Sequence, residues 1–259
     1  MTMELMLQSA IVIAVMMFSV WGMSVPLRDV SIVDLVWGLG FVLVAWSAFL
    51  QAEQTQRDLL SPILISLWGI RLSVHLTWRN HGKPEDKRYQ AMRARHGSRF
   101  PIVSLLSVFG LQGVVMWCVA LPLMSAQETE PGPPILAIAG TIVFVVGFLF
   151  ESVADWQLSR FKSAPANSGR VMNRGLWRFS RHPNYFGEIL VWWGMFLVTL
   201  GAGAAWWTVL SPLLMTFLLM RVSGVTLLEK SLLKDKPEYA EYRASTNTLI
   251  PWFPRHRQR

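Results

Sequence analysis

Residues 173–194 read NRGLWRFSRHPNYFGEILVWWG, and this stretch joins a basic, polar segment directly to an apolar run. Pro183 is typical of the first turn of a helix, because proline lacks the N–H group that a helix leaves unpaired there. The run from 185 to 201 approaches the length of about 20 residues that a bilayer-crossing helix needs. The stretch therefore predicts a membrane helix with polar side chains at its start.

Six further apolar runs predict the same kind of helix. With the first run, the expected spans are residues 5–25, 32–50, 59–78, 102–125, 134–155, 185–201 and 204–228. The chain of 259 residues is 53% hydrophobic and 15% charged, which disfavours a soluble enzyme, and the lone Cys118 disfavours a disulfide scaffold. We expect an all-α polytopic membrane protein with seven transmembrane helices in a single domain, 1–259.

The basic residues are distributed unevenly among the connections between these runs. Lys and Arg number seven in 79–100, six in 156–184 and seven from Lys230 onward, whereas 126–133 has none. Basic connections tend to stay in the cytoplasm. We therefore expect the N-terminus outside and the C-terminus in the cytoplasm, with all three basic segments on the inner face.

Two interpretations of this basic surface remain open. It can be a solvated face that touches anionic lipid, or it can be a pocket for a polyanionic cofactor. Nucleic acid is not expected as a partner, because no recognisable binding module is present.

Ionisable residues inside the runs are candidates for function, since charge in a bilayer is costly. Asp34, Trp37 and Phe41 share one helical stripe, and Trp68, Arg71, His75 and Trp78 share another. The two stripes can face each other. Either Asp34 and Arg71 form a structural ion pair, or the stripes line an aromatic-walled polar pocket.

Two later runs direct polar residues toward the predicted inner boundary. Glu151, Asp155 and Lys162 repeat at helical spacing at the end of one run. Arg221, Val225 and Glu229 do so at the end of another. Their convergence with the basic segment 156–184 predicts a site there.

The residue types around 173–194 suit recognition of a phosphorylated ligand. Arg binds phosphate in a bidentate manner, Asn can donate to and accept from a carboxamide, and aromatic faces stack on flat rings. The aromatic residues can instead form an interfacial belt. Residues 201–206, GAGAAW, are expected to be a turn between helices rather than a dinucleotide fingerprint, and the five histidines lack metal-ligand spacing, so no metal is expected.

This stretch, together with the spans and the ending EYAEYRASTNTLIPWFP, resembles the membrane steroid 5-alpha-reductase family, in particular its bacterial branch. The core RHPNY-x-GE also occurs in sterol C14-reductases and, more distantly, in isoprenylcysteine carboxyl methyltransferases. The resemblance implies an integral protein of a bacterial inner membrane that binds NADPH on its cytoplasmic side. It also implies hydride transfer to an electron-poor carbon–carbon double bond.

The resemblance further implies which residues contact the cofactor. They are Asp155, Lys162, Arg170, Trp177, Asn184, Tyr185, Glu188, Arg221 and Glu229. Glu229 stands where the relatives carry Tyr, so this position departs from the pattern.

For catalysis, the family steroid reductases use an acid on the second span and a tyrosine on the third. Asp34 matches the acid, and its expected role is to donate toward a substrate carbonyl on which negative charge develops. Residues 59–78 contain no tyrosine, so Arg71, His75 or a tryptophan N–H is expected to replace it. The implied substrate is a 3-oxo-4-ene steroid or a similar lipid.

Two alternatives remain. One is S-adenosylmethionine-dependent methylation of a lipid or prenylated thiol, since those methyltransferases share the RHP-x-Y feature. The other is a non-enzymatic lipid-binding or transport protein, although no inverted repeat is visible. We expect a monomer in the lipid bilayer.

Overall fold

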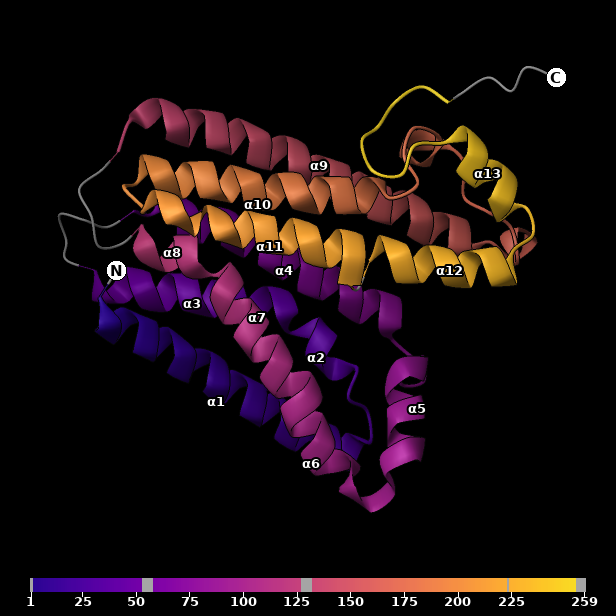
Figure 1. The fold of residues 1–259 in the computed structure, drawn as a ribbon, viewed down its shortest axis with the longest axis horizontal. Coiled ribbons are helices and arrows are strands. Elements are labelled where there is room, and N and C mark those ends of the chain that lie inside the picture. Colours follow the sequence, from indigo (N-terminus) through magenta and orange to yellow (C-terminus); the bar gives the residue numbers. More distant parts are fainter. Residues whose placement is uncertain (1, 53–57, 127–131, 223, 255–259) are drawn as a thin grey trace. The chain divides into compact units, whose positions relative to one another are not determined.

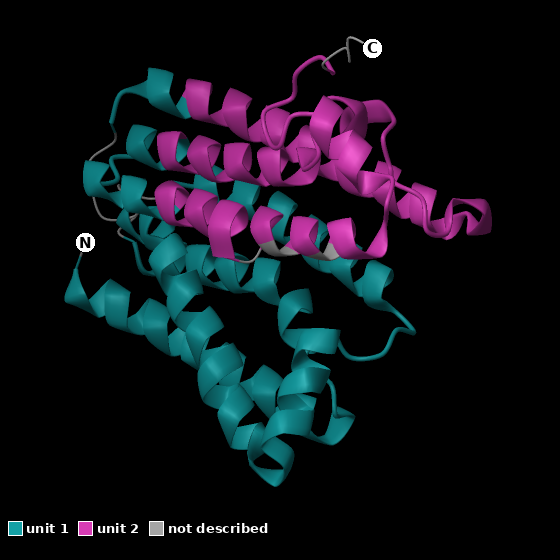
Figure 2. Cartoon of the chain, turned by 45° about the vertical axis from the view of Figure 1, so that its right-hand side comes forward, with its two compact units in different colours: residues 1–137, 198–211 teal, residues 138–197, 212–259 magenta. Residues whose placement is uncertain are grey.

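A computed structural model describes residues 2–52, 58–126, 132–222 and 224–254 (Figure 1). These residues form helices, turns and loops without a β-strand, which confirms the all-α prediction. The chain divides into two compact units, residues 1–137 with 198–211 and residues 138–197 with 212–259 (Figure 2). The prediction that the chain is a single functional domain stays a prediction.

The first unit contains the N-terminal helices and a later turn. Its helices are α1 (Met3–Leu27), α2 (Ile32–Leu35), α3 (Trp37–Gln51), α4 (Leu60–Asn80), α5 (Lys87–His96), η1 (Gly97–Arg99), α6 (Phe100–Ser104), η2 (Leu105–Gly110), α7 (Leu111–Val119), α8 (Leu121–Ser125) and η5 (Trp206–Val209). η2 is a π-helical segment, and residues 202–205 form the turn expected from GAGAAW.

Helices α3 and α4 of the first unit pack through glycine. A Cβ atom at Gly69 would lie 2.5 Å from the carbonyl oxygen of Gly38, so the two backbones meet directly. Beside this contact the rings of Phe41 and Trp68 lie 5.9 Å apart. The two predicted aromatic stripes therefore face each other at this point.

The second unit contains the longest helix and the C-terminal elements. Its helices are α9 (Pro134–Ser163), η3 (Pro165–Asn167), η4 (Gly175–Arg178), α10 (Pro183–Gly201), α11 (Leu210–Phe217), η6 (Leu218–Val222), α12 (Val225–Asp235) and α13 (Tyr239–Ser245), with a few residues of α9, α10 and α11 belonging to the first unit. As expected, α10 begins at Pro183.

Four of the described helices are long and apolar enough to cross a membrane. They are Met3–Leu27, Leu60–Asn80, Lys87–Val119 and Pro134–Ser163, and Trp37–Gln51 and Trp206–Val222 are shorter apolar helices. These helices indicate a membrane protein. The number of seven spans and the orientation stay predictions.

Two of the predicted runs are not continuous helices. Residues 32–50 divide into α2 and α3 at Val36. The last run ends in the π-helical η6 at Val222, and α12 starts only at Val225 after Gly224, whose ψ of −107° is not helical. The expectation that Arg221, Val225 and Glu229 lie on one helix face is therefore wrong, because this break separates Arg221 from the other two.

Helices α9 and α10 also meet backbone to backbone. A Cβ atom at Gly147 would lie 2.6 Å from both the carbonyl oxygen of Gly187 and the amide nitrogen of Val191. Small residues permit such close approach between membrane helices. This contact sets the register in which polar residues at the end of α9 meet those at the start of α10.

We expect Gly187→Ala to destabilise the protein by about 1–3 kcal/mol, because the added methyl group would overlap the backbone of Glu151 in α9. Thermal unfolding of purified protein measures the change. The matched control is Gly22→Ala in α1, where nothing lies within 4 Å of an added Cβ atom. Equal melting temperatures for the two variants would contradict the close packing.

Candidate functional site

All nine residues predicted to contact a cofactor fall in the second unit. Asp155 and Lys162 lie on α9, and Asn184, Tyr185 and Glu188 lie on the first turns of α10. The others are Arg170 and Trp177 in the connection between these helices, Arg221 on η6, and Glu229 on α12. Residues up to 74 positions apart in the sequence thus lie in one compact unit.

The structure brings Asp155 and Asn184 together. The amide nitrogen of Asn184 donates to Oδ1 of Asp155 at 3.2 Å, and Asp155 is buried whereas Asn184 is half-buried. Glu188 follows Asn184 by one helical turn and is also half-buried. This pair presents a carboxylate and an amide side by side, which suits recognition of hydroxyl or carboxamide groups.

Exposed cations lie at the end of α9 and in the connection from α9 to α10. Lys162 and Arg170 are exposed, and the backbone carbonyl of Arg170 accepts a hydrogen bond from Lys236 at 2.6 Å. The ring of Trp177 is buried, and its Nε1 donates to the carbonyl of Ala154 at 3.0 Å. Trp177 therefore holds this loop against α9.

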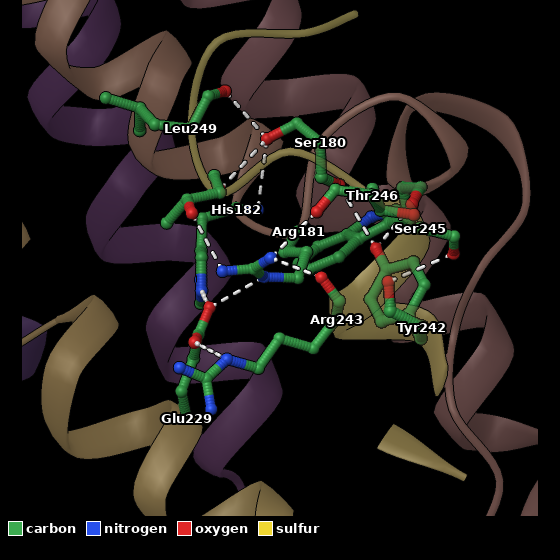
Figure 3. A network of polar contacts seen from close by, with 11 residues as sticks. Ser180, Arg181, His182, Glu229, Tyr242, Arg243, Ser245, Thr246 and Leu249 are labelled. Carbon is green, nitrogen blue, oxygen red and sulfur yellow. Dashed lines mark hydrogen bonds and ion pairs between the residues drawn. The ribbon is translucent and has the colours of Figure 1, made fainter. Parts of the chain in front are cut away.

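A buried ion-pair cluster lies directly before α10 (Figure 3). Nε of Arg181 and Nε2 of His182 lie 2.8 Å and 3.0 Å from the same oxygen of Glu229, Oε1. Arg243 approaches the other oxygen at 3.5 Å from a half-exposed position. Glu229 is thus occupied by three basic side chains of its own chain.

Arg181 also binds α13 and the segment that follows it. Its Nη1 donates to the carbonyls of Arg243 in α13 and of Thr246 after it at 2.9 Å and 2.7 Å, and its Nη2 donates to the hydroxyl of Thr248 at 2.7 Å (Figure 3). Next to Arg181, the hydroxyl of Ser180 donates a further hydrogen bond to the carbonyl of Leu249 at 2.7 Å. One guanidinium therefore joins the start of α10 to both α12 and the C-terminal segment.

The imidazole of His182 links this cluster to the predicted cofactor residues. It stacks on the ring of Tyr185, with centroids 5.4 Å apart and an angle of 4° between the planes. Nδ1 of His182 is buried and has no hydrogen-bond partner in the part of the chain that the structure describes. Tyr185 is thus held in orientation by a side chain that is itself fixed by Glu229.

The charge state of Glu229 follows from these contacts. Burial alone would raise its pKa, but the hydrogen bonds from His182 and Arg181 outweigh burial and hold the pKa at about 2. Arg181 and His182 were not predicted as site residues. The signal for them was their position immediately before Pro183, but their partner Glu229 lies 48 and 47 positions away and no local pattern reveals it.

A second polar group lies in the first unit around Asp34. Oδ2 of Asp34 lies 3.8 Å from Nη2 of Arg88. The next residue, Tyr89, accepts a hydrogen bond at its hydroxyl from Nε2 of Gln112 at 3.4 Å.

Tyr89 is the residue that sequence reasoning missed. The search for a tyrosine beside Asp34 covered the run 59–78, whereas Tyr89 lies on α5, a helix inside the predicted loop 79–100. The ion-pair partner that the structure gives Asp34 is Arg88 rather than Arg71. Arg71 lies on α4, half-buried and with interactions of its own.

Among the residues that the structure describes, no three His, Cys, Asp or Glu side chains are grouped so that they could hold a metal ion.

We expect Glu229→Gln to destabilise the protein by about 3–5 kcal/mol at neutral pH, because it leaves the buried Arg181 cation without a counter-charge. Glu229 has a lower pKa in the folded protein, about 2, than its usual 4.5. Its stabilising contribution is therefore present above pH 4.5 and is lost as the pH falls toward 2.

Thermal unfolding of both proteins between pH 7 and pH 3 checks this. The melting temperatures of wild type and Glu229→Gln should converge at the acid end, and the exposed Glu241→Gln should follow wild type throughout. A constant gap between wild type and Glu229→Gln would contradict the assignment.

Comparisons with known proteins place the chain in a family. One curated relative, the probable O-methyltransferase ustE of Ustilaginoidea virens, is 33% identical over 90 residues, which cover 32% of this chain and 31% of that protein. The match thus spans about a third of the relative's length. No solved structure matches the chain significantly. The family described as "Protein of unknown function (DUF1295)" matches residues 20–246, and this family is steroid 5-alpha-reductase-like. The chain therefore belongs to the DUF1295 family.

Proposed function

We propose that this protein is a membrane-bound, NADPH-dependent reductase of a carbon–carbon double bond conjugated to a carbonyl group. The substrate class is a 3-oxo-4-ene steroid or a similarly shaped lipid. The family supports an enzyme of the reductase or methyltransferase superfamily, and the apolar helices support a substrate drawn from the bilayer.

The observation that carries the proposal is the group formed by Asp34, Gln112 and Tyr89. Reduction of a conjugated alkene places negative charge on the carbonyl oxygen, and an enzyme must direct a hydrogen-bond donor at that oxygen. The phenol of Tyr89 is such a donor, since it accepts from Gln112 and keeps its own hydrogen to donate, and Asp34 pairs with the adjacent Arg88. Methyl transfer to a nucleophile develops no such oxyanion.

The residues of the second unit fit NADPH. Lys162 and Arg170 are exposed cations suited to phosphate groups, and the pair of Asp155 and Asn184 suits ribose hydroxyls or a carboxamide. NADPH, when bound, supplies the hydride. Glu229 has a different task, because its carboxylate is already bound by Arg181 and His182 and orients Tyr185 through the stacked imidazole.

The proposal includes a location. The basic segments 79–100 and 156–184 and the basic C-terminal end favour a cytoplasmic cofactor site. A bacterial inner membrane and a monomeric working unit are further parts of the proposal. Arg221 is assigned to cofactor contact by the resemblance, and Arg71 is a candidate to replace the family tyrosine that residues 59–78 lack.

One observation favours a second function. The relative named a probable O-methyltransferase supports S-adenosylmethionine-dependent methylation of a lipid as the alternative. The two functions differ in cofactor, since NADPH carries several phosphates and S-adenosylmethionine carries none. Titration of the purified protein with NADPH, NADH and S-adenosylmethionine separates them, and preference for S-adenosylmethionine would overturn the reductase.

Arg170→Ala and Asn184→Ala should each weaken NADPH binding by about 1–3 kcal/mol, because each removes a charged or partly buried polar contact. Binding is measured by titration in detergent. Arg95→Ala removes an exposed arginine from α5 and is the matched control that should bind NADPH as wild type does. Wild-type affinity in both test variants would remove these residues from the site.

Tyr89→Phe should lower the rate of hydride transfer to a 3-oxo-4-ene steroid by about a hundredfold or more, as loss of one oxyanion donor does, while NADPH affinity stays unchanged. Single-turnover oxidation of NADPH measures this rate. The control is Asp86→Asn. Asp86 lies near Tyr89 in the sequence, and its carboxylate binds Arg88 at 3.0 Å, the arginine that also pairs with Asp34. Normal turnover by a folded Tyr89→Phe protein would refute the role of the phenol.

A further inference from the structure

The surface of α9 shows where this helix leaves the membrane. Its exposed apolar side chains form a stripe that ends one turn before Trp156, namely Ile135, Ile138, Ile142, Val145, Val146, Leu149 and Val153. Trp156 is 58% exposed, and the guanidinium of Arg160 lies 5.5 Å from its ring centroid. An exposed Trp beside a long basic side chain is typical of the membrane–water interface.

The length of α9 agrees with this boundary. From Pro134 to Ala154 the helix rises about 30 Å at about 1.5 Å per residue, which equals the thickness of a bilayer core of about 30 Å. Ala154 and Trp156 therefore lie at one edge of the hydrocarbon region.

Hydrogen bonds place the segment after α13 at the same depth as this boundary. Trp177 of η4 donates to the carbonyl of Ala154 at 3.0 Å, so η4 lies at the level of this boundary. Two residues further on, the carbonyl of Phe179 accepts from the amide of Trp252 at 2.9 Å, and the ring of Phe179 meets that of Phe253 at 5.9 Å. The segment after α13 thus returns to the loop that follows α9 (Figure 1).

This returning segment is apolar and exposed. Ile250 is 66% exposed, Trp252 66% and Phe253 73%, although the backbone around them is fixed. Three large apolar side chains of a well-held segment cost free energy if water surrounds them. Arg178 is exposed and directly precedes Phe179, which adds positive charge suited to lipid phosphate.

We propose that residues 249–254 form an interfacial anchor, whose Trp252 and Phe253 insert into the headgroup region of the bilayer that α9 spans. The occupant of this surface is lipid, because the segment lies at the depth of the Trp156 boundary and combines aromatic rings with basic neighbours. The anchor is independent of the proposed reductase activity. Through Ser180 and Arg181 it joins the bilayer surface to the Glu229 cluster.

Site-directed spin labelling in lipid nanodiscs tests this anchor. A nitroxide is attached to Phe253→Cys in the full chain, with Cys118→Ala removing the single native cysteine, and the discs contain phosphatidylcholine with phosphatidylglycerol. The control is Glu238→Cys, an exposed position between α12 and α13 in the same unit. Collisions with oxygen, which concentrates in lipid, are compared with collisions with a water-soluble nickel chelate.

The label at 253 should collide more with oxygen than with the chelate, and the label at 238 should show the reverse. A label at 253 that behaves like the one at 238 would place the segment in water and overturn the anchor. Protection of the label at 253 from both reagents would also overturn it, since that result indicates a protein surface as the occupant. A label at Ile250→Cys that repeats the first pattern would extend the anchor to the whole segment.

Discussion

A buried guanidinium is the constraint around which the second unit is arranged. Arg181 is 8% exposed, and a cation taken out of water must recover its solvation from the protein. It does so from one carboxylate of α12, one carbonyl of α13, and one carbonyl and one hydroxyl of the segment after α13. Because guanidinium hydrogen bonds lie in one plane, their positions are fixed relative to each other and to the start of α10.

The same cluster also fixes the orientation of a side chain in the proposed cofactor site. Glu229 fixes the imidazole of His182, and the imidazole fixes the ring of Tyr185. On the other side of α10 the glycine contacts with α9 bring Asn184 to Asp155. The ion pairs of the cluster thus position Tyr185, and the backbone contacts between α9 and α10 position its neighbour Asn184 on the same helical turn.

Hydrophobicity was sufficient to predict the class of fold and the approximate position of most helices, since bilayer length and apolar content are local properties. It did not reveal the interruptions at Val36 and Gly224, because both lie inside apolar runs. The residues that the resemblance selected as cofactor contacts share one unit, and Asp155 and Asn184 among them are hydrogen bonded, while their role stays a prediction. The resemblance missed Tyr89 and the partners of Arg181, since contacts over 23 to 67 positions depend on how helices pack.

The long sequence separations around Arg181 also bear on how the chain acquires its structure during synthesis. Glu229 follows Arg181 by 48 positions and the hydroxyl of Thr248 by 67, so the guanidinium leaves the ribosome well before its partners. At about 5–20 residues per second this interval lasts about 3–13 s. During that time the cation must stay hydrated, and the start of α10 has to remain outside the hydrocarbon. The final packing of α10 is therefore a late event, which awaits the translation of residues 229–248.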